Sequence, residues 1–521
     1  MVLSRLEVVQ SGGSNREMPS VQRNCCVIKW AVVFAVLAMG WGADPRPRTE
    51  LLSARMQTGG PPGMAAGIGS AGDAAVRHLP KLRIRERNRH LIEDENGKPF
   101  FIAGFSPQNI VHWCTPAQMD TYFADRQAKH FNFAWLVVNG YDVSTGKPDV
   151  TDDTQGAANP VDFRGNSMLL NGPSWSPKNL NPAYVAAVDA MVRSAANHGI
   201  YVFLDPFNAA YDPGPADFDP SHHSSEEMRQ WGEFWGSRYK NYSHVNFLFG
   251  NDRMVSPQID SLVEGLKKYM PDRLMTTDWI GGPPNWSSDA TGPHRFFDAG
   301  HRWVNFNGWY EYHAPQWATW FHYQMANPVM PTCIVETFYE GCKYGNPKPS
   351  PTIPLRLRQQ AWSTVLNGGT GFGFLGCQDG IDDPVKWFGK TPGVLQAQYC
   401  TTFFTTRRWY DLMPDWSHMF LPSQLGTPGK DDYAYVSAGL TGDGSLGVYY
   451  YPGENGGGFQ LNVNMSKLGG GSGTSMARWY DPTNGAYHTV GTLANSGSHI
   501  FITPEANSKG AADWVLVLEK N

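Results

Sequence analysis

Two acidic residues each stand at the end of an apolar run, where a carboxylate is available for chemistry. Asp252 follows the run 245–250, and Glu336 closes the run 331–336, in which an unpaired acid would be costly unless it faced an opening. Structural uses remain open, because Asp252 could pair with Arg253 or cap the next helix, and Glu336 could be a buried structural acid. As a pair they suit cleavage of a glycosidic bond, in which one acid protonates the leaving oxygen and the other attacks or stabilises the anomeric carbon.

The elements that must position these acids alternate short apolar runs with longer helical patterns. This alternation is typical of repeated βα units around a parallel sheet, and eight such runs predict an α/β fold, a (β/α)8 TIM barrel. In a barrel the carboxyl ends of the strands meet at one mouth, and about three βα units separate Asp252 from Glu336, so both acids are expected there. The expected strands are residues 100–104, 131–138, 200–205, 245–250, 274–278, 303–307, 332–336 and 371–375.

Further polar and aromatic residues lie near the ends of these strands, and we predict that they bind the substrate. Asn251, directly before Asp252, is placed to hydrogen-bond a sugar hydroxyl beside the reacting centre. Aromatic rings offer flat faces to sugars, although core packing is the alternative use of each ring, and turns or helix caps are the alternative for the polar residues. The polar candidates are His112, Asn139, Asp205 and Asp278, and the aromatic candidates are Trp113, Trp135, Trp279, Trp309, Tyr310 and Tyr339.

The chain of 521 residues is longer than one hydrophobic core normally organises, and its composition changes along its length. Residues 1–43 carry basic residues, a short apolar run and then small residues, which predicts a secretory signal peptide, with an uncleaved membrane anchor as the alternative. Residues 44–81 are rich in Gly, Pro, Ala and Arg and predict a disordered linker. The barrel is expected over 82–412. We expect a secreted or periplasmic protein with no stable membrane association after signal cleavage.

Residues 413–521 consist of short aromatic strands divided by Gly, Asn and Asp turns, which predicts a C-terminal antiparallel β-sandwich domain. We expect this domain to pack against the barrel. Carbohydrate affinity is the alternative, because Trp416, Trp479 and Trp514 could lie in the core or on a contact surface.

The net charge and the cysteine content argue against some classes of function. A net charge of −5 with a pI near 6.3 provides no basic field, which argues against a nucleic-acid partner. Two of the seven cysteines fall in the signal, and the spacing of the rest matches no zinc pattern. We expect one or two disulfides and a buried free thiol. We expect neither a metal nor a cofactor. The five cysteines concerned are Cys114, Cys333, Cys342, Cys377 and Cys400.

Several runs also resemble a known family. The match covers roughly residues 82–409 and resembles the apiosidase-like glycoside hydrolases, while the tail is similar to the collagen-binding domain that commonly follows that barrel. The resemblance implies a retaining glycosidase with an aspartate acid/base after the fourth strand, matching Asp252, and a glutamate nucleophile on the seventh, matching Glu336. Its best-known activity is release of apiose from plant pectin. The runs are WGEFWGSRY (231–239), VNFLFGNDR (245–253), IVE (334–336), RQQAWSTVLNG (358–368), ARWYDP (477–482) and DWVLVLE (513–519).

The expected function is therefore a secreted retaining glycoside hydrolase acting on plant or microbial polysaccharide or its side chains. The alternative is a non-catalytic carbohydrate-binding or adhesion protein on a decayed barrel, against which the intact pair of acids weighs. A metal-dependent hydrolase lacks support, because the first strand carries no paired His and His222 and His223 are adjacent. An esterase would need a Gly-x-Ser-x-Gly elbow in a strand-turn-helix context. The insertion at about 141–180, beside the mouth, leaves the exact sugar open.

Overall fold

The computed structural model describes most of the chain after residue 75. The predicted signal and most of the predicted linker lie outside the described residues. No helix among the residues described is long and apolar enough to cross a membrane. All described residues belong to one compact unit, Gly72–Asn521. They are 76–139, 159–171, 175–208, 222–250, 256–278, 301–312, 314–338, 340, 353–374, 391–422 and 433–521.

Eight parallel strands form the centre of the first domain, in the order β8-β7-β6-β5-β4-β11-β10-β9. The two end strands approach each other, because the Gly308 N–H donates to Thr276 Oγ1 at 2.8 Å and the Asn305 N–H donates to the Met275 carbonyl at 3.1 Å. The sheet is therefore a nearly closed barrel, and the predicted α/β TIM-barrel fold is confirmed. The strands are β4 (Ile102–Phe105), β5 (Phe133–Val137), β6 (Tyr201–Asp205), β7 (Val245–Gly250), β8 (Met275–Asp278), β9 (Asn307–Tyr310), β10 (Thr332–Glu336) and β11 (Gly371–Phe374).

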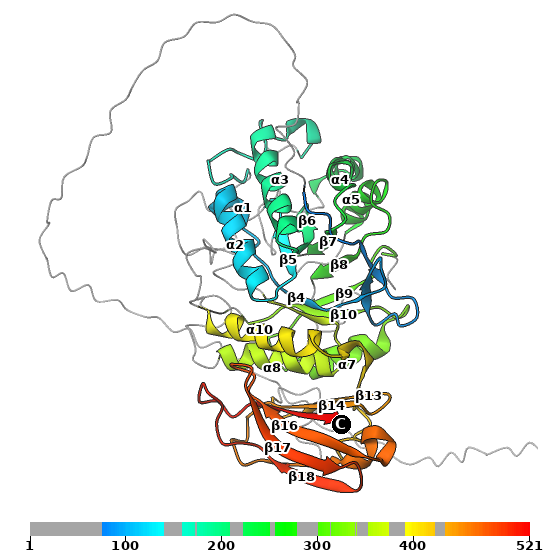
Figure 1. Cartoon of the computed structure of the whole chain (residues 1–521). Helices are drawn as coiled ribbons and strands as arrows, with labels where there is room; N and C mark the ends of the chain where they lie inside the picture. Colours follow the sequence, from blue (N-terminus) through cyan, green and yellow to red (C-terminus); the bar gives the residue numbers. More distant parts are fainter. Residues whose placement is uncertain are drawn as a thin grey trace, which may run out of the picture. The chain divides into compact units, whose positions relative to one another are not determined.

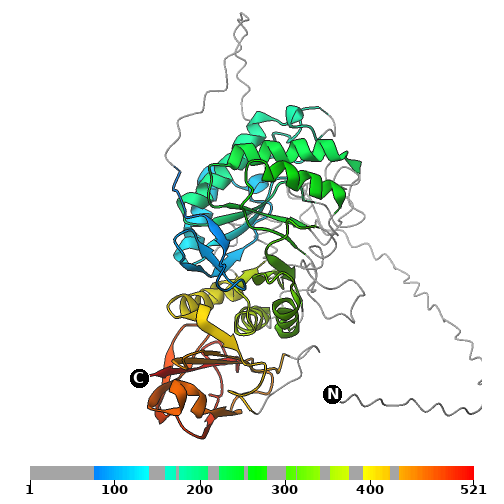
Figure 2. The same cartoon turned by 90° about the vertical axis from the view of Figure 1, so that its right-hand side faces the viewer.

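Both faces of this sheet are buried, as parallel sheets require. On β5, Phe133 and Trp135 join the core inside the barrel, whereas Ala134 and Leu136 join the core beneath the helices. Helices cover the outside of the sheet (Figure 1, Figure 2). They are α1 (Ile110–Trp113), α2 (Pro116–Ala128), α3 (Pro182–Asn197), α4 (Ser225–Tyr239), α5 (Pro257–Lys267), α7 (Gln316–Met325), α8 (Ile353–Leu366) and α10 (Pro392–Thr405).

The sixth barrel strand lies later in the chain than predicted. The expected run was 303–307, whereas β9 begins at Asn307. The preceding residues serve as core and anchor instead, because Phe306 enters the barrel interior and the Trp303 indole N–H donates to Asp260 Oδ1 at 2.7 Å. Apolar content alone could not distinguish these buried residues from the strand that follows them.

A small antiparallel sheet precedes the barrel and was not predicted. Its strands are β1 (Leu82–Ile84), β2 (Ile92–Asp94) and β3 (Pro99–Phe100). Leu82 and Ile92 pack in the same core as the barrel interior, on the side where the strands begin. This sheet therefore covers the amino-terminal end of the barrel and leaves the carboxyl ends of the strands for chemistry.

The second domain, called the β-domain from here on, is antiparallel. It has a six-stranded sheet, β12-β13-β14-β19-β16-β17, and a two-stranded sheet, β15-β18. The prediction of a C-terminal domain built from antiparallel sheets is confirmed. Trp479 and Trp514 belong to its core and are 5% and 2% exposed, so they provide no contact surface. The strands are β12 (Leu412–Pro414), β13 (Ser437–Thr441), β14 (Leu446–Tyr451), β15 (Gln460–Asn464), β16 (Thr474–Tyr480), β17 (Tyr487–Ala494), β18 (Ser498–Ile502) and β19 (Trp514–Lys520).

The expectation about cysteines needs correction. Cys114, Cys333 and Cys400 are all free and buried, and burial raises the pKa of the Cys333 and Cys400 thiols well above the ordinary value. Two disulfides are therefore excluded. Cys342 and Cys377, the other two of the five cysteines that follow the predicted signal, lie outside the described residues.

Helix α8 joins the two domains through a buried ion pair. The Arg358 guanidinium contacts both carboxylate oxygens of Asp513, at 2.8 and 2.7 Å, and the two side chains are 3% and 0% exposed. Tyr450 and Asn507 donate further hydrogen bonds to the same carboxylate, at 3.1 and 2.8 Å. The Trp362 ring of α8 also stacks on Tyr450 at 5.9 Å. The expected packing of the β-domain against the barrel is present.

This ion pair yields a test of domain docking. Replacing Arg358 by Met leaves the Asp513 carboxylate buried without its cation, which typically costs about 3 kcal/mol or more. We expect Arg358→Met to lower the free energy of unfolding by roughly that amount in chemical denaturation. The double variant with Asp513→Asn should recover part of the loss, because it removes the uncompensated charge. Arg408→Met, which breaks solvent-accessible pairs with Asp411 and Asp443, is the control. Equal losses in Arg358→Met and Arg408→Met would contradict the assignment.

Candidate active site

The carboxyl ends of the barrel strands bring polar side chains to one level. Asp205, Asp278 and Glu336 are the last residues of β6, β8 and β10. Asp278 pairs with Gly250 at the end of β7, and Glu336 pairs with Tyr310 at the end of β9. Because all eight strands are parallel, these residues form one rim, which is the usual place for catalysis in this fold.

A β-bulge in β10 determines which way Glu336 points. Ile334 pairs with Trp309, and Glu336 pairs with Tyr310. Between these two pairs the chain advances by two residues along β10 but by only one residue along β9. Strict alternation would place Glu336 on the same face as Ile334, which packs in the outer core with Trp309. The bulge instead pairs Glu336 with Tyr310, the residue after Trp309, and therefore turns its side chain toward the inside of the barrel.

Tyr312 holds the Glu336 carboxylate in place. The tyrosine hydroxyl donates a hydrogen bond to Glu336 Oε1. Its ring lies 5.5 Å from the Tyr310 ring and 6.3 Å from the Phe338 ring. Glu336 is only 2% exposed, so this contact fixes the orientation of a nearly dry carboxylate. An oriented acid at the rim can act as a nucleophile or as an acid/base.

The predicted partner acid lies outside the described residues. Asp252 is the second residue after β7, whose bounds Val245–Gly250 match the expected strand. Asn251, Trp279 and Tyr339 also lie outside the described residues. Their roles stay predictions.

Two of the predicted polar ligands build the loops around the rim. The Asn139 amide donates to the Asn208 carbonyl at 3.0 Å, and the Asn208 N–H donates to Asn139 Oδ1 at 2.7 Å. Oδ1 of Asp205 accepts the Phe207 N–H at 3.1 Å. These contacts are the turn-forming use that stood as the alternative for such residues. Asp278 is fully buried at the end of β8.

Helix α1, which follows the first barrel strand, carries two further candidates. His112 is 5% exposed, and its Nδ1 contacts the Val161 carbonyl. Trp113 is 36% exposed, the largest exposure among the described aromatic candidates. Trp113 is therefore partly exposed to solvent, whereas His112 ties the helix to the segment around Val161.

The other described aromatic candidates differ in exposure. Trp135 is fully buried inside the barrel. It pairs with Phe203, two residues before Asp205 on β6, so it lies below the rim. Trp309 is fully buried on the opposite face, where it stacks on His322 of α7 at 5.5 Å and donates to Thr332 Oγ1 at 2.8 Å. Both rings serve core packing, the alternative use of these residues. Tyr310 is half-buried and pairs with Glu336.

The comparisons with known proteins agree with this geometry. A family model described as "Apiosidase-like, catalytic domain" matches residues 85–411, more than half of the chain. The chain belongs to the apiosidase-like family. A second model, described as "Putative collagen-binding domain of a collagenase", matches residues 425–519 of this apiosidase-like chain. Both parts of the predicted resemblance are confirmed, and the chain has the fold of a glycoside hydrolase.

Solved structures extend the likeness to the whole described unit. A protein described as a glycoside hydrolase is 18% identical with a TM-score of 0.68, and the match covers 85% of this chain and 99% of that one. A glycoside hydrolase family 5 protein from Bacteroides vulgatus is 18% identical with a TM-score of 0.67, covering 84% and 93%. At these identities the likeness shows the fold alone. A search of curated proteins found no match.

The sequence did not point to Tyr312. It stands two residues beyond β9, a position that would have qualified it as a rim residue had the sixth strand been placed correctly. Glu340 was also missed. Its Oε1 accepts the Gly393 N–H at 2.8 Å in the first turn of α10, so this buried acid anchors a helix. No group of three His, Cys, Asp or Glu side chains suited to a metal occurs among the residues that the structure describes.

The Tyr312 contact predicts a graded loss of activity. Tyr312→Phe keeps the ring but removes the hydrogen bond to Glu336, and a charge-assisted bond of this kind is worth about 1.5–3 kcal/mol. We expect kcat to fall roughly 10- to 100-fold while the melting temperature changes little. Tyr201→Phe is the matched control, because its hydroxyl donates to the Pro80 carbonyl at the opposite end of the barrel. A wild-type kcat in Tyr312→Phe would show that the hydroxyl does not orient the carboxylate.

Proposed function

We propose that this apiosidase-like chain is a secreted, retaining glycoside hydrolase. The observation that carries the proposal is the Glu336 carboxylate, which the β10 bulge turns inward and Tyr312 orients at the rim. Asp252 supplies the second acid after β7. The expected order of the two acids along the chain is also the order that the family resemblance implies.

In the first step, one oxygen of the Glu336 carboxylate attacks the anomeric carbon and forms a glycosyl ester. The bond to the leaving oxygen breaks, and the Asp252 carboxylic acid gives its proton to that oxygen. In the second step, the Asp252 carboxylate takes a proton from water, whose oxygen attacks the anomeric carbon and releases Glu336.

Retention requires carboxyl groups about 5 to 5.5 Å apart. The fourth and seventh strands lie across the mouth from each other, and an eight-stranded barrel is narrow enough to be filled by side chains. Acids that point inward from these strands can therefore approach to the shorter spacing. An inverting enzyme would instead leave room for a water molecule between them.

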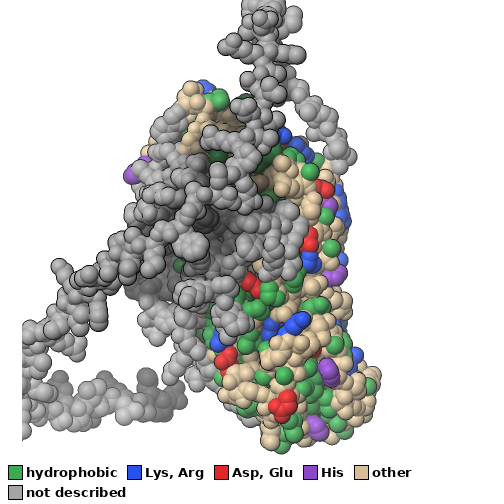
Figure 3. All heavy atoms as spheres, turned by 90° about the vertical axis from the view of Figure 1, so that its left-hand side faces the viewer, with side chains coloured by type: hydrophobic (Ala, Val, Ile, Leu, Met, Phe, Trp, Pro, Cys, Tyr) green, Lys and Arg blue, Asp and Glu red, His purple; other side chains and the backbone are tan. Residues whose placement is uncertain are grey.

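The substrate that we propose is a plant or microbial polysaccharide or one of its side chains, with apiosides among the candidates. The exposed indole of Trp113 offers one stacking surface beside the rim. Positive and negative side chains are interspersed on the described face in Figure 3, without the continuous basic area that a nucleic acid would need. Export through the predicted signal would bring the enzyme to such polymers.

Substitution of each acid tests the proposal. Glu336→Gln and Asp252→Asn keep the shape of the side chains but lose nucleophilicity and proton donation, so we expect each variant to lose turnover by at least about 10³-fold. The Asp252 variant should recover partly on aryl glycosides whose leaving groups need no proton. Hydrolysis is followed by release of reducing sugar from a polysaccharide panel and of the aryl group from synthetic glycosides.

Glu340→Gln is the matched control, because Glu340 is a buried acid that accepts the Gly393 N–H of α10, and the amide oxygen of Gln can still accept that bond. We expect its activity to stay close to that of the wild type. Wild-type turnover in Glu336→Gln or Asp252→Asn would overturn the role of that acid, whereas no turnover of any glycoside by the wild-type protein would favour a binding protein on a decayed barrel.

A further inference from the structure

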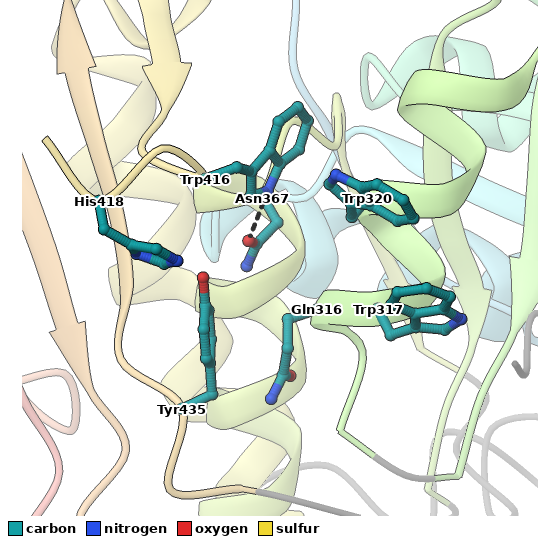
Figure 4. A pocket seen from close by; sticks show the side chains of 7 residues that line it. All are labelled: Gln316, Trp317, Trp320, Asn367, Trp416, His418 and Tyr435. Atoms are coloured by element: carbon teal, nitrogen blue, oxygen red, sulfur yellow. Dashed lines mark hydrogen bonds between the residues drawn. The ribbon is translucent and has the colours of Figure 1, made fainter. Parts of the chain in front are cut away.

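A cavity lies between the barrel helices and the β-domain. It has a volume of about 140 Å³ and is bounded by helix α7, the residue after α8, and the β-domain. We call it the flank pocket (Figure 4). None of the described residues of the candidate active site is among its lining residues. Its lining residues are Gln316, Trp317, Trp320, Asn367, Trp416, His418 and Tyr435.

Indole rings form two sides of the flank pocket. On α7, the Trp317 and Trp320 rings lie 4.7 Å apart at 30°. From the β-domain, the Trp416 indole N–H donates to Asn367 Oδ1 at 3.1 Å. The Asn367 amide is itself fixed, because it donates to the Ser363 carbonyl and to Ser437 Oγ, both at 2.8 Å. The Trp416 ring is therefore held in position before any ligand arrives.

The loop that carries Trp416 and His418 is also rigidly tied. The Asp415 carboxylate accepts the backbone N–H groups of Met419, Phe420 and Leu421, at 3.0, 3.0 and 2.7 Å. Such a loop loses little conformational entropy when it binds a ligand.

Polar groups face the same space. Tyr435 is 4% exposed, and Figure 4 shows its hydroxyl directed between His418 and Trp416. This hydroxyl makes no hydrogen bond to another described residue. Burial, with a smaller effect of the Asp415 charge, raises the pKa of Tyr435 to about 12, so the group keeps its proton and can donate it. Among the described residues that line the flank pocket there is no Asp, Glu, Lys or Arg, which favours a neutral ligand.

We propose that the flank pocket is a second carbohydrate-binding site, which takes a neutral sugar residue of a polysaccharide chain outside the catalytic mouth. A sugar ring has an apolar face that stacks on indole and hydroxyls that bond to the polar groups at the edge, and this combination matches the lining. The site goes beyond the proposed function and needs neither Asp252 nor Glu336. It would hold a polymer chain close to the enzyme between cleavage events.

Affinity gel electrophoresis with soluble arabinan, arabinogalactan and galactomannan tests the site, with polygalacturonan as the charged comparison. The parent is the Glu336→Gln protein, which avoids cleavage during the run. We expect at least one neutral polymer to retard the parent, and Trp320→Ala to weaken that binding about tenfold, which corresponds to about 1.4 kcal/mol. Trp320→Phe retains an aromatic face and should retain most of the affinity.

Tyr435→Phe provides a second, isosteric variant and should weaken binding several-fold. Tyr487→Phe removes a half-exposed hydroxyl of the β-domain that bonds to Arg407 outside the flank pocket, and should leave binding unchanged. In the active background, Trp320→Ala should hydrolyse a small aryl glycoside with unchanged kcat/KM. That readout separates this proposal from the catalytic one. Equal retardation of parent, Trp320→Ala and Tyr435→Phe, or no retardation of the parent by any neutral polymer, would overturn the second site.

Discussion

Parallel pairing of eight strands is the constraint on which the candidate site depends. Residues separated by more than a hundred positions, such as Asp205 and Glu336, reach one rim only because every strand runs in the same direction around the barrel. The β10 bulge is a local departure from this regularity. It places a carboxylate on the inner face at a position where alternation would have put it outside.

The β-domain packs against the barrel helices and also contacts a residue at this rim. The Tyr433 hydroxyl donates to the carbonyl of Tyr312 at 3.3 Å, and Tyr312 in turn holds Glu336. Tyr433 is itself packed under the Arg356 guanidinium, 3.9 Å from its ring centre, and Arg356 pairs with Glu454 at 2.5 Å. A chain of contacts therefore connects the β-domain to the Glu336 carboxylate. Domain docking, anchored by Arg358 and Asp513, thus contributes to the setting of the site.

Much of this arrangement could be predicted from local sequence. Seven of the eight barrel strands overlap the predicted apolar runs, and the bounds of β7 and β10 match the predicted runs 245–250 and 332–336. Glu336 was predicted because an acid that closes a buried strand must face an opening. The sixth strand was misplaced because Trp303 and Phe306 are as apolar as a strand but serve as anchor and core.

Other features depend on tertiary contacts that no run of residues reports. The bulge exists only in the pairing of β10 with β9, and Tyr312 becomes recognisable only when β9 is placed correctly. The position of Trp309 also depends on strand pairing. Its position near a strand end indicated a sugar platform, whereas the face that it occupies depends on the register of β9. The free state of Cys114, Cys333 and Cys400 likewise reflects separation in space and not spacing in sequence.

The stereochemistry of the first product tests the central claim, a double displacement through Glu336, most directly. Proton NMR of the sugar released from a defined glycoside, recorded before mutarotation, identifies its anomeric configuration. If Glu336 attacks the anomeric carbon, the first-formed sugar has the same configuration as the substrate. An inverted first product would contradict the covalent role of Glu336 and would require water, activated by a carboxylate, as the attacking group.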